Sequence, residues 1–492
     1  MKILMVYPEY PDTFWSFKHV LKFISKKAAF PPLGLLTVGA MLPDDWDKKL
    51  VDINVEPLKD AHILWADMVF ISAMIIQKKS AQEIIERCRN LGRKVVAGGP
   101  AFTTRCEDFS GVDHFVLNEA EVTLPLFLAD LETGSLKPVY TSQEKPPLTD
   151  TPVPLWSLID MKDYATLAVQ YSRGCPYNCE FCDIVVMNGR KPRTKSVAQI
   201  KRELQAIYDG GWRKSVFIVD DNFIGNRREV KKMLPELITW QQEHNFPFAL
   251  LTEASTDLAK DEDLMQMMSR ANFFKVFLGL ETPDNLSLKE CGKYHNTAHD
   301  LVDAVNTIHR HGMQVMGGFI VGFDNDTESI FETQIKFIQQ IGVVTAMVGL
   351  LTALPKTRLW HRLEAEGRLL SESSGENTDG SLNFMPVMGV EKLQAGYRKI
   401  LKTIYSPKCY YQRINTFIAN YKPTVRSKIR REDLVAFWRS AWRIGILSRA
   451  RFRYWRLLIK TLVRKRVALP IAVELAIYGL HYDKIARRIC KT

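Results

Sequence analysis

Long apolar runs and disulfide-like cysteine patterns are both missing from this sequence of 492 residues. No stretch of about eighteen residues is both apolar and free of charge, so no ordinary membrane-spanning helix is expected. The first residues, Met1–Pro8, have the pattern of a buried strand and not of a signal peptide. Eight cysteines in a chain of this length suit a reducing compartment better than a disulfide framework. We therefore expect a cytoplasmic protein of two to three domains.

Acidic residues are scarce in the last part of the chain. Residues 401–492 hold 22 Lys and Arg against 4 Asp and Glu, whereas the first 400 residues hold 45 against 51. Between Phe437 and Lys484, basic residues alternate with Phe, Trp, Leu and Ile. Such a basic amphipathic pattern indicates contact with a membrane surface or a partner protein, and its charge would also suit nucleic acid. An ordinary helical domain with a solvated basic face is the alternative.

A fourth ligand is missing beside the one cluster of cysteines. Cys175, Cys179 and Cys182 stand within a single short segment, and no further Cys or His is close to them in sequence. Structural zinc is closed by four protein ligands, so three thiols alone argue against a zinc knuckle. A [4Fe-4S] cluster held by only three thiolates keeps one iron open for a small molecule. The cysteines therefore predict an iron–sulfur cluster with an open iron.

Residues 1–140 alternate short β-branched runs with helical patterns, which predicts a doubly wound parallel sheet. The expected strands are 2–7, 49–54, 68–72, 94–97 and 114–117, and the expected helices include 33–41 and 81–91. Ligands bind such sheets beyond the carboxyl ends of the strands. The candidate ligand contacts at these ends are Tyr7, Ser72, Gly98, Gly99 and Glu119. The glycine pair would let a bulky ligand approach the backbone, although it is also an ordinary turn.

Residues 141–160 are rich in proline and predict an extended linker, and a second repeating pattern follows in residues 161–387. Its six expected strands are 167–171, 215–219, 248–252, 275–280, 314–321 and 345–351. The helices expected between them include 197–208, 261–269, 296–311 and 328–341. This rhythm predicts a partial (β/α)6 barrel, in which the chemistry lies at the carboxyl strand ends. The cysteine segment follows the first of these strands, in agreement with that rule.

Acidic residues close three further strands of this region. Asp220 and Asp221 follow the second strand, Glu253 follows the third and Glu281 follows the fourth. A single acid at a strand end is usually a helix cap or a solvated side chain. Three acidic strand ends beside a cysteine loop instead indicate a site for a cation, because carboxylates form strong hydrogen bonds with charged donors.

The cysteine segment resembles the signature of the radical S-adenosylmethionine (SAM) enzymes, because its spacing is C-x3-C-x2-C and Phe181 precedes the last cysteine. The resemblance implies three ligands for a [4Fe-4S] cluster whose open iron binds SAM, namely Cys175, Cys179 and Cys182. It also implies SAM contacts at the acidic strand ends, from Asp220, Asp221, Glu253 and Glu281. The segment Gly318–Gly322 resembles a family element in which Ile320 packs on adenine, although a buried strand isoleucine is equally expected in a core.

The first region resembles the cobalamin-binding domain of B12-type radical SAM enzymes in the order and spacing of its elements, including Pro31–Gly34. The resemblance implies a Rossmann-like domain that holds cobalamin through Tyr7, Ser72, Gly98, Gly99 and Glu119. The Asp-x-His-x-x-Gly motif of other B12 enzymes, whose His binds cobalt, is absent, so no lower His ligand is expected. Residues 388–492, expected to be a basic helical domain, resemble the C-terminal extension of a subgroup that includes the hopanoid C-2 methylases.

These resemblances imply an enzyme that cleaves SAM reductively at the cluster. The resulting 5′-deoxyadenosyl radical would take a hydrogen from an unactivated carbon, and methylcobalamin would donate a methyl group to that carbon. The basic, aromatic tail favours a lipid-like substrate that is met at the membrane surface, with a hopanoid as the leading choice. Methylation of a tetrapyrrole or natural product, and radical cross-linking or cyclisation of a lipid without methyl transfer, remain alternatives.

Other function classes fit less well. A tRNA-modifying radical SAM enzyme would carry further cysteines for a second cluster and a β-rich tail, and a non-enzymatic sensor would not require an open iron. We therefore expect no nucleic-acid partner. A reductase, flavodoxin or ferredoxin is expected to supply the electron, and the basic region to make peripheral contact with the inner face of the membrane. No catalytic side chain is assigned.

Overall fold

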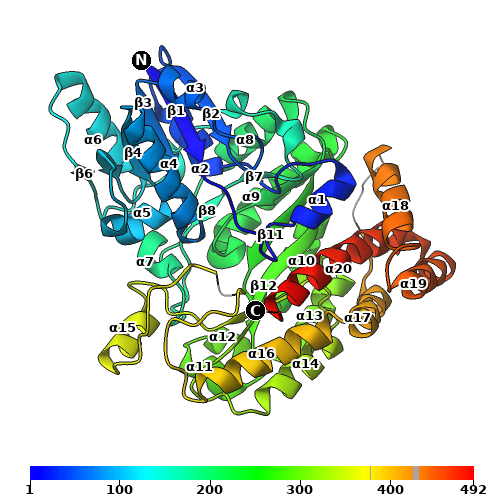
Figure 1. The fold of residues 1–492 in the computed structure, drawn as a ribbon. Coiled ribbons are helices and arrows are strands. Elements are labelled where there is room, and N and C mark those ends of the chain that lie inside the picture. The colour runs from blue at the N-terminus through cyan, green and yellow to red at the C-terminus, as the bar shows by residue number, and fades with distance from the viewer. Residues whose placement is uncertain (377, 425–430, 492) are drawn as a thin grey trace.

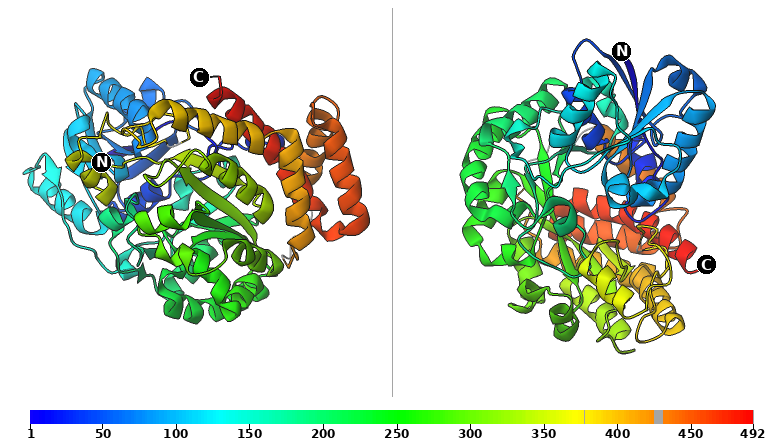
Figure 2. Two further views of the ribbon diagram at one scale, coloured as in Figure 1. Left: turned by 90° about the horizontal axis from the view of Figure 1, so that it is seen from below. Right: turned by 90° about the vertical axis from the view of Figure 1, so that its left-hand side faces the viewer.

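The computed structural model describes residues 1–376, 378–424 and 431–491. Figure 1 shows an N-terminal α/β unit, a second α/β unit built around a curved sheet, and a set of C-terminal helices. Figure 2 shows these parts packed against one another from two further directions. The predicted α/β architecture with a C-terminal helical extension is confirmed.

The first sheet has six strands, and every neighbouring pair runs parallel. The strands are β1 (Lys2–Tyr7), β2 (Asp47–Asp52), β3 (Met68–Ser72), β4 (Lys94–Gly98), β5 (His114–Val116) and β6 (Val139–Tyr140). The helices between them include α2 (Leu33–Met41), α3 (Asp60–Trp65), α4 (Lys78–Asn90), α5 (Pro100–Arg105) and α6 (Ala120–Thr133). In the order β2-β1-β3-β4-β5-β6, the chain adds β2 on one side of β1 and the later strands on the other side, so the strand order reverses between β1 and β3. Ligands of doubly wound folds bind at such a reversal, beyond the carboxyl ends of the strands.

Burial on both faces explains why β1 reads as a continuous apolar run. Ile3, Leu4, Met5 and Val6 have no exposed surface, because helices cover both sides of a parallel sheet. The carboxyl end of β1 therefore lies between helical layers, and Tyr7 stands at that end.

The second sheet also has six parallel strands, but their order follows the sequence. The strands are β7 (Leu167–Val169), β10 (Ser215–Ile218), β11 (Ala249–Ala254), β12 (Phe273–Glu281), β13 (Gln314–Val321) and β14 (Ala346–Leu350). The main helices between them are α8 (Val197–Asp209), α9 (Arg227–Glu243), α10 (Glu262–Arg270), α13 (Leu301–Arg310) and α14 (Ile330–Ile341). Sequential order gives a curved, barrel-like sheet, in which β7 and β14 form the two edges and are not hydrogen-bonded to each other. This is the predicted partial (β/α)6 barrel.

Helix α16 (Val390–Ile404) covers the β14 edge of the barrel. The hydroxyl of Tyr397 donates a hydrogen bond to the carbonyl of Val348 at 3.1 Å, and the hydroxyl of Tyr405 donates to the carbonyl of Ala346. An uncovered edge strand would leave such carbonyl groups as a template for pairing with another chain. The first C-terminal helix thus caps the open side of the sheet.

The remaining C-terminal helices are α17 (Pro407–Asn420), α18 (Arg431–Arg443), α19 (Arg451–Arg464) and α20 (Leu469–Ile489). The segment after β1, which includes α1 (Lys18–Ile24), reaches across to α18 and α20. There the ring of Phe14 packs against Tyr405 and Tyr482, with ring centroids 5.4 and 5.8 Å apart. Among the described residues, no helix is both long enough and apolar enough to span a bilayer.

Two helices differ from the sequence-based expectation. Helix α13 begins at Leu301 and not near residue 296, because the carboxylate of Asp300 accepts a hydrogen bond from the Val302 amide and caps the helix there. The barrel pattern implies a helix at the place of α9, but no bounds were predicted for it, and it contains Pro235 in its interior. Proline usually ends or kinks a helix, so this residue hides the helical pattern from a sequence-based reading.

Candidate active site

The three cysteines lie on a loop, here called the cluster loop (residues 174–183), between a short strand and a short helix. Strand β8 (Ser172–Arg173) pairs antiparallel with β9 (Arg193–Thr194), and α7 (Ile184–Asn188) lies between them in sequence. Gly174 begins the loop with φ 98°, and a Cβ atom there would lie 2.9–3.2 Å from three carbonyl oxygens. Only glycine allows this close turn. The fold therefore places the cysteines at the carboxyl side of the first barrel strand, as predicted.

The far side of the cluster loop is anchored by two other elements. The Glu180 amide donates to the carbonyl of Cys291 at 2.8 Å. The Glu180 carboxylate accepts hydrogen bonds of 2.7 and 3.2 Å from Arg362 on α15 (Arg358–Ala365). This forked, charge-assisted pair fixes the loop between its second and third cysteines.

Asp220 and Asp221, which follow β10, hold the start of the cluster loop. Asp220 accepts hydrogen bonds from the Tyr171 amide and the Ser172 hydroxyl, both at 2.7 Å. One oxygen of Asp221 accepts from the Gly174 amide at 2.7 Å and from the side-chain amide of Asn188 at 2.9 Å. Both acids therefore position the loop, and direct contact of either with SAM stays a prediction.

The thiols fit the predicted cluster. Cys175, Cys179 and Cys182 are half-buried and none is in a disulfide. Burial raises the pKa of each thiol, and the neighbouring cysteine charges raise those of Cys179 and Cys182 further. Deprotonating such buried thiols is unfavourable in the absence of metal. Binding to iron stabilises the thiolates, because the metal supplies positive charge. In the described parts of the chain, no three His, Cys, Asp or Glu side chains are gathered to hold a single metal ion.

Lys293 lies in a buried ion pair beside the cluster loop. Its ammonium contacts the carboxylate of Glu281, and both side chains are at most 10% exposed. Burial alone would disfavour the charged ammonium, but Glu281 and then Cys179 raise the pKa of Lys293 overall. The pair therefore places a lasting positive charge near Cys179. Glu281, predicted as a SAM contact, already has a partner here, so its contact with SAM stays a prediction.

The Glu253 side chain differs from those at the other acidic strand ends because no partner for it lies in the described part of the chain. On β11 it is half-buried, and its side chain makes no hydrogen bond or ion pair within the described residues. Burial, followed by the charges of Asp221 and Asp220, raises the pKa of Glu253 to about 8. An unpaired carboxyl in this position can accept a cation or hydroxyl groups, so its predicted contact with SAM is retained.

The raised pKa of Glu253 gives a testable pH dependence. Between about pH 4.5 and 8 the folded protein keeps a proton on Glu253 that the unfolded chain releases, so this group lowers stability as the pH rises. Glu253→Gln removes that effect. We expect its advantage in unfolding free energy over the native protein to grow from pH 5 to pH 8, as measured by urea denaturation. Glu364→Gln, at a side chain 61% exposed, is the control, and a pH-independent difference for Glu253→Gln would contradict the assignment.

Ile320 lies in a small apolar cluster near the cluster loop. It is 8% exposed and belongs to a buried group with Cys291, Phe323 and Leu351, against which Phe181 packs. The apolar contacts of Ile320 are therefore explained by packing alone. Its contact with adenine stays a prediction.

In the first domain, four of the predicted cobalamin contacts lie at the carboxyl ends of β1, β3 and β4. The Tyr7 hydroxyl donates to that of Tyr10 at 3.3 Å. Gly99 has φ 89°, and a Cβ atom on it would lie 2.5 Å from the Ser72 hydroxyl oxygen. A Cβ atom on Gly98 would lie 2.6 Å from the Val116 carbonyl oxygen. Internal packing thus requires both glycines, and cobalamin contact for all four residues stays a prediction.

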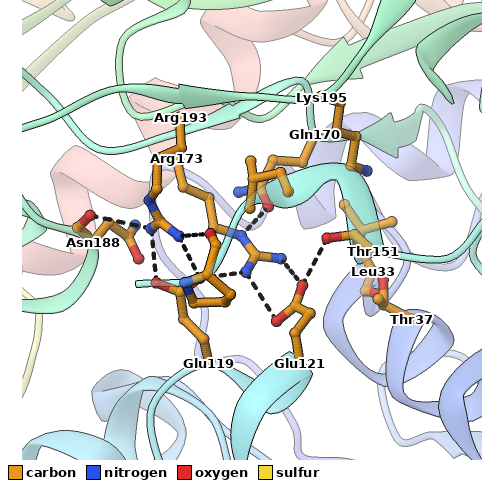
Figure 3. A network of polar contacts seen from close by, with 12 residues as sticks. Leu33, Thr37, Glu119, Glu121, Thr151, Gln170, Arg173, Asn188, Arg193 and Lys195 are labelled. Carbon is orange, nitrogen blue, oxygen red and sulfur yellow. Dashed lines mark hydrogen bonds and ion pairs between the residues drawn. The ribbon is translucent and has the colours of Figure 1, made fainter. Parts of the chain in front are cut away.

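Glu119, the fifth predicted cobalamin contact, follows β5 and lies in an ionic network between the two α/β units (Figure 3), and its contact with cobalamin stays a prediction. Its carboxylate accepts hydrogen bonds of 2.7 and 2.9 Å from Arg193 and one of 2.9 Å from Arg173. Glu121 accepts two from Arg173, at 2.8 and 3.1 Å. The sequence placed Glu119 at the cofactor and did not predict either arginine. The two acids after β5 were the feature of the sequence that could have indicated an ionic network, but their partners lie more than 50 residues further along the chain.

Family models match three parts of the chain. Residues 24–128 match the B12 binding domain, residues 169–338 match the Radical SAM superfamily, and residues 357–492 match a domain of unknown function, DUF4070. The hopanoid C-2 methylase of Rhodopseudomonas palustris (strain TIE-1) is 33% identical, over 97% of this chain and 93% of that protein. The chain belongs to the cobalamin-binding radical SAM methyltransferase family. An uncharacterized methyltransferase of Synechocystis sp. (strain ATCC 27184 / PCC 6803 / Kazusa) is 43% identical, over 92% of this chain and 86% of its own.

Solved structures share the fold of this radical SAM methyltransferase. The radical SAM methyltransferase TsrM from Kitasatospora setae, with cobalamin and a [4Fe-4S] cluster bound, matches with a TM-score of 0.61 at 14% identity, over 76% of this chain and 79% of its own. The cobalamin-dependent radical enzyme OxsB, with aqua-cobalamin bound, matches with a TM-score of 0.64 at 14% identity, over 100% and 80%. The cofactors of this methyltransferase are a [4Fe-4S] cluster, SAM and cobalamin.

Proposed function

We propose that this radical SAM methyltransferase adds a methyl group to an unactivated carbon of a lipid-like substrate, with a hopanoid-type polycyclic lipid as the leading choice. The observation that carries the proposal is a surface that is both apolar and basic on the C-terminal helices. The similarity to a hopanoid C-2 methylase over nearly the whole chain supports the same substrate class.

The bound cofactors supply a carbon-centred radical from SAM and a transferable methyl group from cobalamin. The chain's own part is to bind, orient and shield them. Cys175, Cys179 and Cys182 hold the cluster, and Asp220 and Asp221 fix the turn that presents them. We assign Glu253, whose side chain has no hydrogen-bond or ion-pair partner among the described residues, to the charged or hydroxyl groups of SAM.

Helices α18 and α19 carry the surface that indicates a membrane. They project from one side of the molecule in Figure 1 and in the left view of Figure 2. Residues 431–468, here called the interfacial hairpin, hold eleven basic and two acidic residues. Its exposed large apolar residues are Leu434, Val435, Trp438, Trp442, Ile446, Leu447, Phe452, Trp455, Ile459, Leu462, Val463 and Val467. Trp438 is 70% exposed and Phe452 is 76% exposed.

The inner face of the interfacial hairpin is already used for packing. Ala436, Ile444, Leu457 and Leu458 are buried, and both helices contact α20. The exposed aromatic and aliphatic residues are therefore a second apolar face, which no described part of the chain covers. Large exposed apolar patches mark interaction sites, and the surrounding Arg and Lys residues fit an anionic lipid surface.

Removing two exposed rings should weaken binding to lipid vesicles. We expect Trp438→Ser combined with Phe452→Ser to lower the partition coefficient for phosphatidylglycerol-containing vesicles at least tenfold, because each buried aromatic ring contributes about 1.5–3 kcal/mol. Sedimentation with vesicles measures this. Leu64→Ser combined with Leu126→Ser, which changes side chains 49% and 52% exposed in the first domain, is the matched control. Equal binding by both variants would remove the membrane argument.

The substrate class is tested by offering two kinds of molecule to the reconstituted enzyme. A pentacyclic triterpenoid in vesicles should become heavier by one methylene unit, as seen by mass spectrometry, whereas a magnesium porphyrin should not. The reverse result would move the enzyme to the tetrapyrrole alternative. Modification of neither would leave the family assignment in place and refute the lipid substrate.

A further inference from the structure

Four charged residues form a continuous link between the first domain and the start of the cluster loop. We call Glu119, Glu121, Arg173 and Arg193 the interdomain clamp. Their side chains are only 5–15% exposed. The two acids stand where β5 leads into α6 of the first domain, and the two arginines stand on β8 and β9 beside the cysteines. Figure 3 shows the acids facing the arginines across the boundary.

The clamp reaches the cysteines by two routes. Arg173 is separated from Cys175 only by Gly174, so its side chain fixes the residue from which the cluster loop departs. Arg193 also donates to the carbonyl of Asn188 at 3.3 Å. The side chain of Asn188 then shares an oxygen of Asp221 with the Gly174 amide.

Further contacts hold both arginines in one orientation. The Nε atom of Arg173 donates to Gln170 at 2.7 Å, and Arg193 donates to the carbonyl of Pro146 in the linker at 2.6 Å. The hydroxyl of Thr151 donates to Glu121 at 2.8 Å. A buried pair with forked geometry is directional, so a change at the acids must displace the arginines or leave them unpaired.

We propose that Arg173 and Arg193 are positioning residues through which the first domain sets the geometry of the cluster loop. In this arrangement the loop takes its working position when Glu119 and Glu121 are docked on it. Because these acids follow β5 at the cofactor end of the first sheet, the clamp also fixes the distance between the two cofactor sites. The proposal is independent of the substrate and rests on the cofactors of the family.

The test uses the full-length protein reconstituted with iron, sulfide and cobalamin, and compares it with Glu119→Gln combined with Glu121→Gln. The amides keep the shape but remove the charges. We expect near-native iron content, because all three cysteines remain. With SAM present, however, the electron paramagnetic resonance spectrum of the reduced cluster should change, and 5′-deoxyadenosine formation should fall at least tenfold. Arg173→Lys keeps the positive charge but cannot form two parallel hydrogen bonds with a carboxylate. Its rate of 5′-deoxyadenosine formation should lie between those of the native protein and the double variant.

Asp130→Asn is the matched control, because Asp130 lies on the same helix α6 but pairs with the exposed Lys137 at 3.0 Å. It should leave both the spectrum and the rate unchanged. A native spectrum and native rate in the double variant would overturn the proposal. A second outcome would also overturn it. If less of the double variant folds but its folded fraction keeps the native spectrum, the clamp acts on stability alone. If the double variant does not fold, Glu121→Gln and Arg173→Lys are judged by the same spectrum.

Discussion

Cys179→Ala should abolish formation of 5′-deoxyadenosine from SAM. The cluster loop offers three thiols, and removing the central one leaves only two of them for the iron–sulfur cluster. We expect iron content after anaerobic reconstitution to fall to a small fraction of the native value. Product formation should fall to the level of buffer, as measured by chromatography after reduction with dithionite.

Cys291→Ala is the most informative control for that variant. Cys291 is buried, its backbone carbonyl contacts the cluster loop, and its thiol donates to the carbonyl of Leu288 at 3.4 Å. If the fourth iron is open for SAM, this variant keeps its iron and forms 5′-deoxyadenosine. Loss of iron in Cys291→Ala would show a fourth protein ligand, which would contradict the open site.

Lys293→Met should produce the largest loss of stability. The substitution leaves the Glu281 carboxylate buried without a counter-charge, and removing one partner of a buried ion pair costs about 3–5 kcal/mol. We expect a lower free energy of unfolding in urea at pH 7, followed by circular dichroism. The double variant with Glu281→Gln should recover most of the loss, because no charge is then left unpaired.

Lys137→Met tests whether the loss depends on burial. Lys137 pairs with Asp130, and its side chain is 67% exposed. Exposed ion pairs contribute little to stability, so its urea midpoint should match that of the native protein. A midpoint for Lys293→Met equal to that of Lys137→Met would show that the Glu281–Lys293 pair is solvated in solution.

Local signals in the sequence predict the parts of the site that depend on strand ends. The cysteine spacing and the apolar strand before it place the cluster loop, and the acids after β10 and near the end of β11 lie at the expected edge of the barrel. These predictions succeed because a parallel sheet brings the carboxyl ends of its strands together whatever the details of packing. The residues Asp220 and Asp221 were thus located correctly, although their hydrogen bonds to the loop were not foreseen.

Long-range charge pairing could not be predicted from the sequence. Glu119 and Arg173 are 54 residues apart, and nothing in their local patterns identifies them as partners. Glu281 contacts Lys293 where the pairing of β12 with β13 is irregular between Gly279 and Glu281, and Glu281 has φ 58°. The exposed surface of the C-terminal helices could not be predicted either. Their total charge predicts a surface role, but only packing decides that α18 and α19, and not α20, remain exposed.

Transfer of a labelled methyl group tests the central claim most directly. The reconstituted enzyme would be given SAM with a deuterated methyl group, a reductant, and a pentacyclic triterpenoid in anionic vesicles. We predict that the lipid acquires the labelled methyl on a previously unactivated carbon while 5′-deoxyadenosine accumulates in proportion. Cleavage of SAM to 5′-deoxyadenosine without any label in the lipid would contradict the account.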